Sequence, residues 1–301
     1  MLVVSLLTFG LLRAIPGDAV LAQLEDSPRL SRQEIEELRA ELGLNDPLWA
    51  QYARWVGGIL IGDFGRSFGG GLEITSEFKR RLPYTAELAV LALVISIVIG
   101  VPFGAASAFV RGSPLDYLLR LFAVFWLAVP NFWIATMALI LPVVWFGWSP
   151  NIVATKLTEA PAQHLVDMLI PGAIMGISSS AVSLRMTRSQ VLEVLRQDYI
   201  RTAYAKGLGS LTVLRRHALR NALIPVVTIW GTQASGLLSG SVLMETIFGI
   251  PGLGQWTVES IRLRDYPVTQ ALVLFFAFAT MAVNLLVDLS YSWLDPRIRV
   301  G

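Results

Sequence analysis

The chain has 301 residues, of which 54% are hydrophobic and 15% charged, and its mean hydropathy is +0.60. A soluble domain carries about 25% charged residues, so this composition excludes an ordinary water-soluble protein. The formal net charge of +2 excludes nothing by itself. The charged residues are instead missing in blocks, and these blocks predict how the chain is organised.

The first apolar segment is too short to cross a bilayer. It runs from Met1 to Leu12 and ends at Arg13 and Pro16. A secretory signal peptide has a basic start and a small-residue cleavage site, and this segment has neither. We interpret residues 1–15 as the outer end of a first spanning helix whose beginning lies outside this sequence. An interfacial segment that never crosses is the alternative.

Residues 16–82 have the composition of a soluble segment. Ser31 and Glu34 form a capping-box pattern, and apolar residues then recur at every third or fourth position. This predicts a short amphipathic helix over about 32–42, ended by Gly43. We expect the segment to pack on the membrane domain as a cover, and docking of a delivery partner is the alternative role. Glycines predict turns after the helix at Gly57, Gly58, Gly62, Gly65 and Gly69–Gly71.

Five long segments lack Asp, Glu, Lys and Arg. A bilayer span needs roughly 17 to 25 apolar residues, and a chain in lipid must satisfy its backbone within helices. Two of the segments are rich in Gly and Ser, which predicts an inner ring of closely packed helices that can separate. A static, tightly packed bundle is the alternative. The predicted spans cover about 83–110, 117–147, 166–184, 221–244 and 268–291.

The basic residues set the orientation. The predicted inside segments 111–120, 185–220 and 295–301 hold 12 Lys/Arg, whereas the predicted outside segments 149–167 and 246–268 hold three. The positive-inside rule therefore places the loop 185–220 and the C-terminus in the cytoplasm. We expect an all-α polytopic membrane protein with about six transmembrane helices, the first one truncated.

The sequence contains none of the common catalytic motifs. The zinc-protease, serine-hydrolase and phosphate-loop patterns are absent, there is no cysteine, and His164 and His217 lie on opposite sides of the predicted membrane. We therefore expect no enzyme activity, no cofactor and no metal site. Glu87, Glu245 and Asp288 lie near span ends, where a helix-end or pairing role is favoured over a proton relay at mid-membrane.

The polar stretch 185–220 is the most informative segment, with eight Lys/Arg and two acids. It is tethered to the membrane at both ends and is too short to fold alone, so we expect it to bind a partner outside the chain. The alternative is that the basic residues merely hold the loop inside and contact anionic lipid.

A short helix is predicted within this stretch. Ile200, Ala203 and Gly207 form an edge of small residues that could enter a groove on a partner. Gly207 and Gly209 would end the helix, because glycine accepts the left-handed conformation. Ser210 could then cap a second helix.

The stretch resembles the EAA loop of binding-protein-dependent ABC importer permeases, in the form found in the oligopeptide/dipeptide/nickel permease family. The motifs follow the family's order over nearly the whole chain. In the loop they are Asp198-Tyr199-Ile200-Arg201-Thr202-Ala203, Ala205-Lys206-Gly207, His217-Ala218-Leu219, Asn221-Ala222 and Pro225. Towards the N-terminus they are Pro16-Gly17-Asp18, Gly43-Leu44, Asp46-Pro47, Gly62-Asp63 and Arg81-Leu82-Pro83. Towards the C-terminus they are Glu245-Thr246-Ile247-Phe248, Pro251-Gly252-Leu253-Gly254, Arg264-Asp265-Tyr266-Pro267 and Leu294-Asp295-Pro296-Arg297.

Three features depart from the family. Arg201-Thr202-Ala203 stands where the general pattern has Glu-Ala-Ala, as in its subfamily, and Ala19 stands where proline is usual. The chain also lacks the family's basic start and the first half of its opening helix.

The resemblance implies a type I ABC importer transmembrane domain over 83–291, including the cytoplasmic loop 185–220, with an extracytoplasmic region 16–82 and a cytoplasmic tail 292–301. It implies as partners a second permease subunit, expected to form a heterodimer, cytosolic ATPase subunits, an extracytoplasmic binding protein and the inner membrane of a prokaryote, with no nucleic acid. The residues that it assigns to ATPase coupling are Asp198, Tyr199, Arg201, Thr202, Ala203, Ala205, Lys206 and Gly207.

The resemblance leaves the substrate open. A di- or oligopeptide is expected, and nickel chelates, glutathione and sugars are alternatives. A stand-alone ion-coupled carrier and a membrane scaffold without transport are the rival functions.

Overall fold

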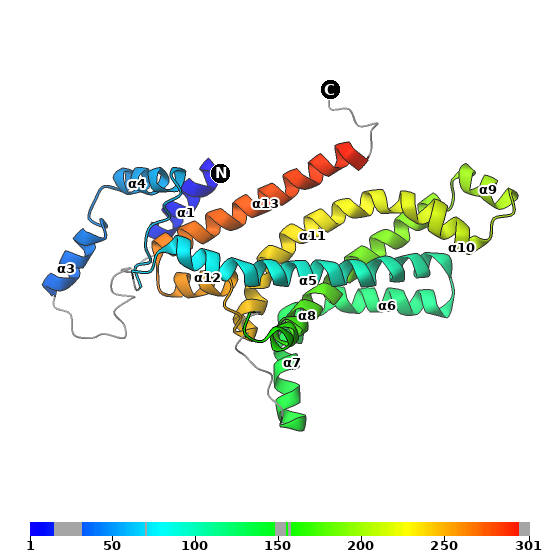
Figure 1. Cartoon of the computed structure of the whole chain (residues 1–301), viewed down its shortest axis with the longest axis horizontal. Coiled ribbons are helices and arrows are strands. Elements are labelled where there is room, and N and C mark those ends of the chain that lie inside the picture. The colour runs from blue at the N-terminus through cyan, green and yellow to red at the C-terminus, as the bar shows by residue number, and fades with distance from the viewer. Residues whose placement is uncertain (15–31, 70, 148–154, 156–157, 295–301) are drawn as a thin grey trace. The chain divides into compact units, whose positions relative to one another are not determined.

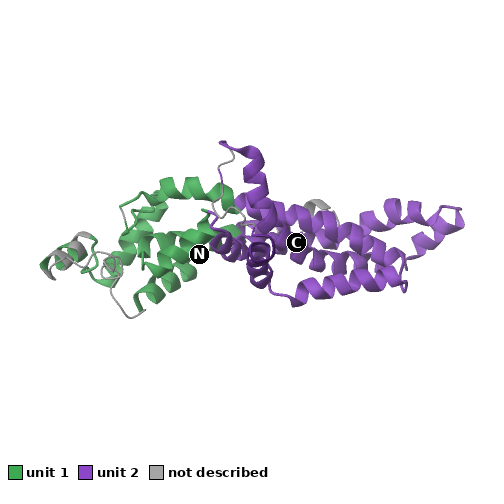
Figure 2. Cartoon of the chain, turned by 90° about the horizontal axis from the view of Figure 1, so that it is seen from below, with its two compact units in different colours: residues 1–85, 251–279 green, residues 86–250, 280–301 purple. Residues whose placement is uncertain are grey.

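The computed structural model describes residues 1–14, 32–69, 71–147, 155 and 158–294. Regular structure in this part of the chain is helical, apart from an isolated bridge between Arg66 and Glu73 (Figure 1). The chain divides into two compact units, coloured separately in Figure 2. Unit 1 comprises Met1–Thr85 and Pro251–Ala279, and unit 2 comprises Ala86–Ile250 and Thr280–Gly301.

Unit 1 is built from short helices and the beginnings of two long ones. Buried Leu253 begins α12, and its backbone N–H donates to Thr85 Oγ1 at 2.8 Å, which supplies one of the partners that a helix N-terminus lacks. The core of the unit consists of Ile74, Leu253, Trp256, Val268, Ala271 and Leu272. The helices are α1 (Leu2–Ala14), α3 (Arg32–Glu41), α4 (Leu48–Leu60), α12 (Leu253–Arg262) and the first parts of α5 (Ile74–Phe109) and α13 (Tyr266–Leu294).

Helix α3 confirms the predicted amphipathic helix, and Gly43 follows it with a φ of +66°. The cap predicted at Ser31 lies outside the described residues. Turns are confirmed at Gly62 and Gly69, and Gly62, Gly65 and Gly71 have positive φ.

The prediction of turns at Gly57 and Gly58 is wrong, because both residues lie inside α4. This helix is held by aromatic contacts to α1: the ring of Phe9 lies 5.2 Å from that of Tyr52 and 6.0 Å from that of Trp55. Ser5 Oγ also lies 2.8 Å from the Tyr52 hydroxyl. Each glycine costs a helix about 1 kcal/mol, and these tertiary contacts outweigh that cost.

Unit 2 contains the remaining helices. α10, η1 and α11 form one continuous helical run, Ser210–Phe248, and η1 is a π-helical stretch within it. The second helix predicted to begin at Ser210 is therefore the start of a spanning helix, and no side chain caps it. The helices of unit 2 are α6 (Pro114–Ala128), α7 (Asn131–Phe146), α8 (Pro161–Val194), α9 (Asp198–Ala205), α10 (Ser210–Thr212), η1 (Val213–Ala218) and α11 (Leu219–Phe248).

Four described helices are long and apolar enough to cross a membrane, and a bent pair makes up to five. α1 is a shorter apolar helix. The helices also extend beyond the predicted limits. α5 has 36 residues, so it is about 54 Å long and exceeds the roughly 30 Å apolar core of a bilayer.

The predicted span over 117–147 is not one continuous helix. It consists of two helices, α6 and α7, which pass together as a candidate span and meet at an angle of 91°. Proline has no N–H to donate and disfavours helical backbone in the residue before it. Val129, which precedes Pro130, accordingly takes φ −89° and ψ 124° and ends α6.

Small residues bring α5 and α8 into close contact within unit 2. A Cβ added at Gly176 would lie 2.6 Å from Ile95 Cβ, and one at Gly104 would lie 2.6 Å from the Leu184 carbonyl oxygen. Gly236 on α11 differs, since a Cβ there would meet no atom within 4 Å. The close approach predicted for the Gly- and Ser-rich span 166–184 is thus confirmed at Gly176, where the neighbouring helix is α5.

Candidate functional site

Helix α9 connects two of the long helices of unit 2 (Figure 1). Three residues separate it from the end of α8 at Val194, and four separate it from the run that begins at Ser210. Its end has the geometry of a Schellman motif: Leu208 N–H donates to the Ala203 carbonyl and Gly207 N–H to the Tyr204 carbonyl. Gly207 takes a φ of +82°, which confirms that glycine ends this helix.

One face of α9 is buried against its own chain. Ile200 and Ala203 are 1% and 6% exposed and belong to a cluster with Val191 of α8 and Val213 and Leu214 of η1. Two residues of the edge that was expected to enter a partner's groove, Ile200 and Ala203, therefore face inward, whereas Gly207 is exposed. This packing joins α9 to both long helices, so a displacement of α9 must move their ends.

The opposite face of α9 is exposed. A hydrogen bond ties it to α11, since Asn221 Nδ2 donates to the Tyr199 hydroxyl at 2.8 Å. Arg201 pairs with Asp198 at 3.3 Å, and both side chains are largely in solvent. Of the residues assigned to coupling, all but Ala203 are exposed: Asp198, Tyr199, Arg201, Thr202, Ala205, Lys206 and Gly207.

A buried ion pair anchors the part of α8 that leads to α9. Asp116 at the start of α6 is 1% exposed and accepts from Arg188 Nε and Nη2, both at 3.0 Å. Ser107 Oγ donates to the same carboxylate at 2.5 Å and Gly112 N–H at 3.0 Å. Sequence reasoning missed this group, although Asp116 is the only acid in the predicted inside segment 111–120.

A second ionisable contact lies at the other end of α8. His164 Nε2 lies 2.9 and 2.8 Å from the two carboxylate oxygens of Glu87 on α5. The predicted pairing role of Glu87 is confirmed. Glu245 is fully buried in α11, and the side chain of Asp288 lies outside the described residues.

Between these ends, one amide links three long helices. Gln233 Nε2 of α11 donates to the Ser179 carbonyl of α8 at 2.9 Å, and Gln233 Oε1 accepts from Ser96 of α5 and Ser183 of α8 at 3.2 Å. No charge marks this site in the sequence, so charge patterning could not find it.

In the part of the chain that the structure describes, several helices are long and apolar enough to span a membrane, and α9 connects two of them. This is the architecture of a polytopic membrane protein. Sequence comparison identifies its family. Residues 100–300 match the family described as binding-protein-dependent transport system inner membrane component, and residues 1–89 match the N-terminal region of such components. The chain belongs to this family.

Two relatives illustrate the similarity. A putative peptide transport system permease protein of Brucella abortus (strain 2308) is 40% identical over 99% of this chain and 95% of the relative. The dipeptide transport system permease protein of Escherichia coli (strain K12) is 38% identical over 98% of this chain and 94% of the relative.

Solved structures support the fold. A chain of the inward-facing MetNI methionine ABC transporter superimposes with a TM-score of 0.59 at 17% identity, covering 72% of this chain and 96% of the solved one. A chain from an amino acid ABC transporter gives 0.55 at 16% identity, covering 72% and 94%.

These findings establish an ABC importer permease, a multi-pass protein of the inner membrane whose family implies separate ATPase subunits and a substrate-binding protein. The rival assignment as a stand-alone ion-coupled carrier is not supported, because the matching family is that of binding-protein-dependent transport components.

Proposed function

We propose that this permease carries a di- or oligopeptide as one of two permease subunits, paired with a different chain, and that it performs no bond chemistry. The peptide assignment is supported by the names of the relatives, which are peptide and dipeptide permeases. In this proposal residues 83–291 form the translocating domain, 1–15 the end of a first span, 16–82 an outer cover and 292–301 a cytoplasmic tail.

The exposed face of α9 is the surface that contacts the ATPase. The observation that supports this best is the division of α9 into two faces. Ile200 and Ala203 pack against α8 and η1, while Tyr199, Arg201 and Lys206 remain exposed on the other side. Such a helix can bind a partner through one face and transmit the partner's motion through the other.

The motion that α9 transmits from the ATPase changes the equilibrium between the inward-open and outward-open states of the permease. A partner shifts such an equilibrium only by binding the two states with different affinity. In this chain the motion enters two spans together, because α9 packs on the end of α8 and on the run that continues as α11. The permease thus provides a helical bundle with two conformations. The ATPase shifts the equilibrium between them because it binds the two with different affinity.

Cysteine crosslinking tests the contact, since the chain has no cysteine of its own. We expect a short bifunctional crosslinker to join Ala205→Cys or Lys206→Cys to an ATPase subunit in membranes that contain the assembled complex. The yield should change when nucleotide is added. Trp49→Cys is the matched control, because Trp49 is 75% exposed but lies on α4 in unit 1.

Equal crosslinking of the ATPase from position 49 would contradict the proposal that α9, and not α4, faces the ATPase. If neither α9 position captured an ATPase while the complex remained intact, the assignment of α9 as the coupling surface would be wrong.

A further inference from the structure

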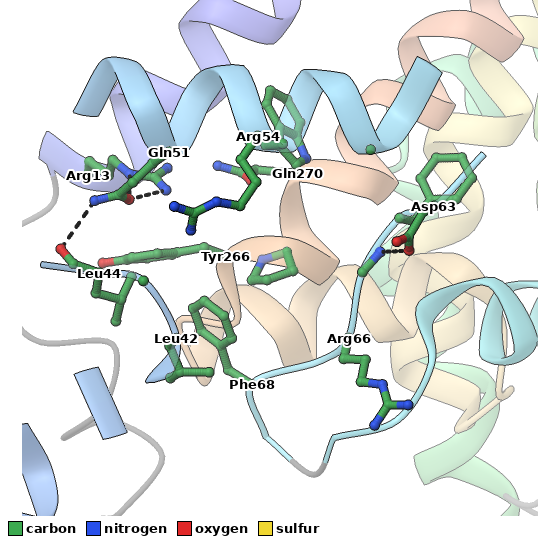
Figure 3. Close-up of a pocket in the computed structure, with 16 residues that line it drawn as sticks. Arg13, Leu42, Leu44, Gln51, Arg54, Asp63, Arg66, Phe68, Tyr266 and Gln270 are labelled. Atoms are coloured by element: carbon green, nitrogen blue, oxygen red, sulfur yellow. Dashed lines mark hydrogen bonds between the residues drawn. The ribbon is translucent and has the colours of Figure 1, made fainter. Parts of the chain in front are cut away.

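Unit 1 contains a cavity of about 400 Å³ that the coupling mechanism does not use (Figure 3). Its walls come from α1, the turn after α3, α4, the segment around residues 63–68 and the start of α13. Trp55, Phe68 and Tyr266 contribute aromatic surface. The charged lining residues are Arg13, Arg54, Arg66 and Asp63, so three cations face one acid.

Two of the three cations have no acidic partner among the described residues. Arg54 pairs with Asp46. Arg13 is half-buried and donates to the neutral Gln51 Oε1 at 2.8 and 3.1 Å, with no carboxylate within 4 Å among the described residues. Arg66 is exposed and likewise has no ion pair in the described part of the chain. The cavity therefore has a surplus of positive charge and of hydrogen-bond donors.

An independent feature of the cavity points the same way. Gln270 is 2% exposed and lines the cavity (Figure 3), and its Nε2 has no hydrogen-bond partner among the residues that the structure describes. A buried amide without a partner is costly, whereas an apolar side chain of the same shape would carry no such cost. A donor kept unpaired in the wall of a cationic cavity fits a site that receives an acceptor from a ligand.

We propose that this cavity binds a carboxylate presented from the outer side of the membrane. Guanidinium groups and an amide N–H both donate to carboxylate oxygens, and guanidinium pairs with carboxylate in a favourable planar geometry. The placement on the outer side rests on the proposed function. The carboxylate can come from the C-terminus of a small peptide or from an acidic side chain of the binding protein.

The test uses the full permease complex with its ATPases in lipid nanodiscs. One arm titrates alanyl-alanine and its C-terminal amide by calorimetry, and the other measures association of the cognate binding protein by surface plasmon resonance. Arg66→Gln and Gln270→Leu should each weaken the carboxylate-dependent interaction about tenfold, as for loss of a hydrogen bond to a charged group. Arg80→Gln is the control, because Arg80 lies in unit 1 but outside the cavity.

Weaker binding of alanyl-alanine, but not of its amide, would identify a peptide carboxylate as the ligand. Weaker association of the binding protein alone would identify an acidic side chain. Unchanged affinity in both arms for both variants would overturn the proposal. In that case the only expected effect of Gln270→Leu is a higher melting temperature, because leucine removes a buried amide without a partner. This failure differs from that of the proposed function, which would appear as missing ATPase crosslinks from α9 whatever happens at the cavity.

Discussion

Glycine residues serve two different purposes in this chain. Gly207 supplies a backbone conformation, since its φ is +82° and a Cβ there would meet no atom within 4 Å. Gly176 supplies space, because a Cβ there would lie 2.6 Å from Ile95 Cβ and 2.8 Å from the Ala92 carbonyl oxygen. The first role follows from position in a motif and was predicted. The second depends on which helix lies opposite.

Gly176→Ala should destabilise the protein by about 1–3 kcal/mol, as is typical of overpacking. Gly236→Ala is the matched control, since α11 leaves open space at that position and alanine favours a helix over glycine by about 1 kcal/mol. Thermal unfolding in detergent, followed by tryptophan fluorescence, compares the two variants. Equal melting temperatures would show that α5 does not pack on Gly176.

At the scale of elements, contacts between residues distant in sequence decide whether a segment forms a helix when its local sequence pattern is ambiguous. α3 was predicted because a capping pattern, a periodic apolar face and a terminal glycine agree. α4 was missed because its two glycines favour turns locally, whereas its aromatic contacts to Phe9 come from α1. The break between α6 and α7 could have been found from Pro130, but a long charge-free segment favoured one span.

The Asp116–Arg188 pair offers a test at this scale. Asp116→Asn should destabilise the contact of α6 with α8 by about 3–5 kcal/mol, because removing one partner leaves a buried charge uncompensated. The double variant Asp116→Asn with Arg188→Met should recover part of that loss, since it removes both charges. Melting temperatures of the two variants and of the control Arg120→Gln measure this. A double variant no more stable than the single one would show that the pair itself is not the anchor.

At the scale of the whole molecule, α9 matters through its connections. Three residues separate it from α8 and four from the continuous run Ser210–Phe248. Both connections are short and hydrogen-bonded, for example from Leu208 N–H to the Ala203 carbonyl. A π-helical stretch, η1, follows directly, and such stretches occur often at functional sites.

Gly207→Asp should uncouple ATP hydrolysis from uptake while membrane insertion stays normal. The positive φ is unfavourable by about 1–2 kcal/mol for a residue with a Cβ, so the end of α9 should rearrange. Gly209→Asp adds the same charge two residues later, where φ is −67° and the helix N-cap favours aspartate. Uptake and ATPase activity in proteoliposomes containing the whole complex, measured together, give the coupling ratio.

We expect the ratio to fall for Gly207→Asp and to stay near the parent value for Gly209→Asp. An equal fall in both would mean that the added charge, and not the backbone at residue 207, is responsible.

The sequence by itself determined the class of fold, the approximate spans, the short helix between two of them and the family, because these depend on composition, period and local motifs. Only the tertiary structure decided that α9 buries Ile200 and Ala203, that Asp116 pairs with Arg188, and that Gln233 and its two serine partners meet. Each of these facts depends on which residues, far apart in the chain, pack against one another. The local conformational preferences of the residues do not determine that packing.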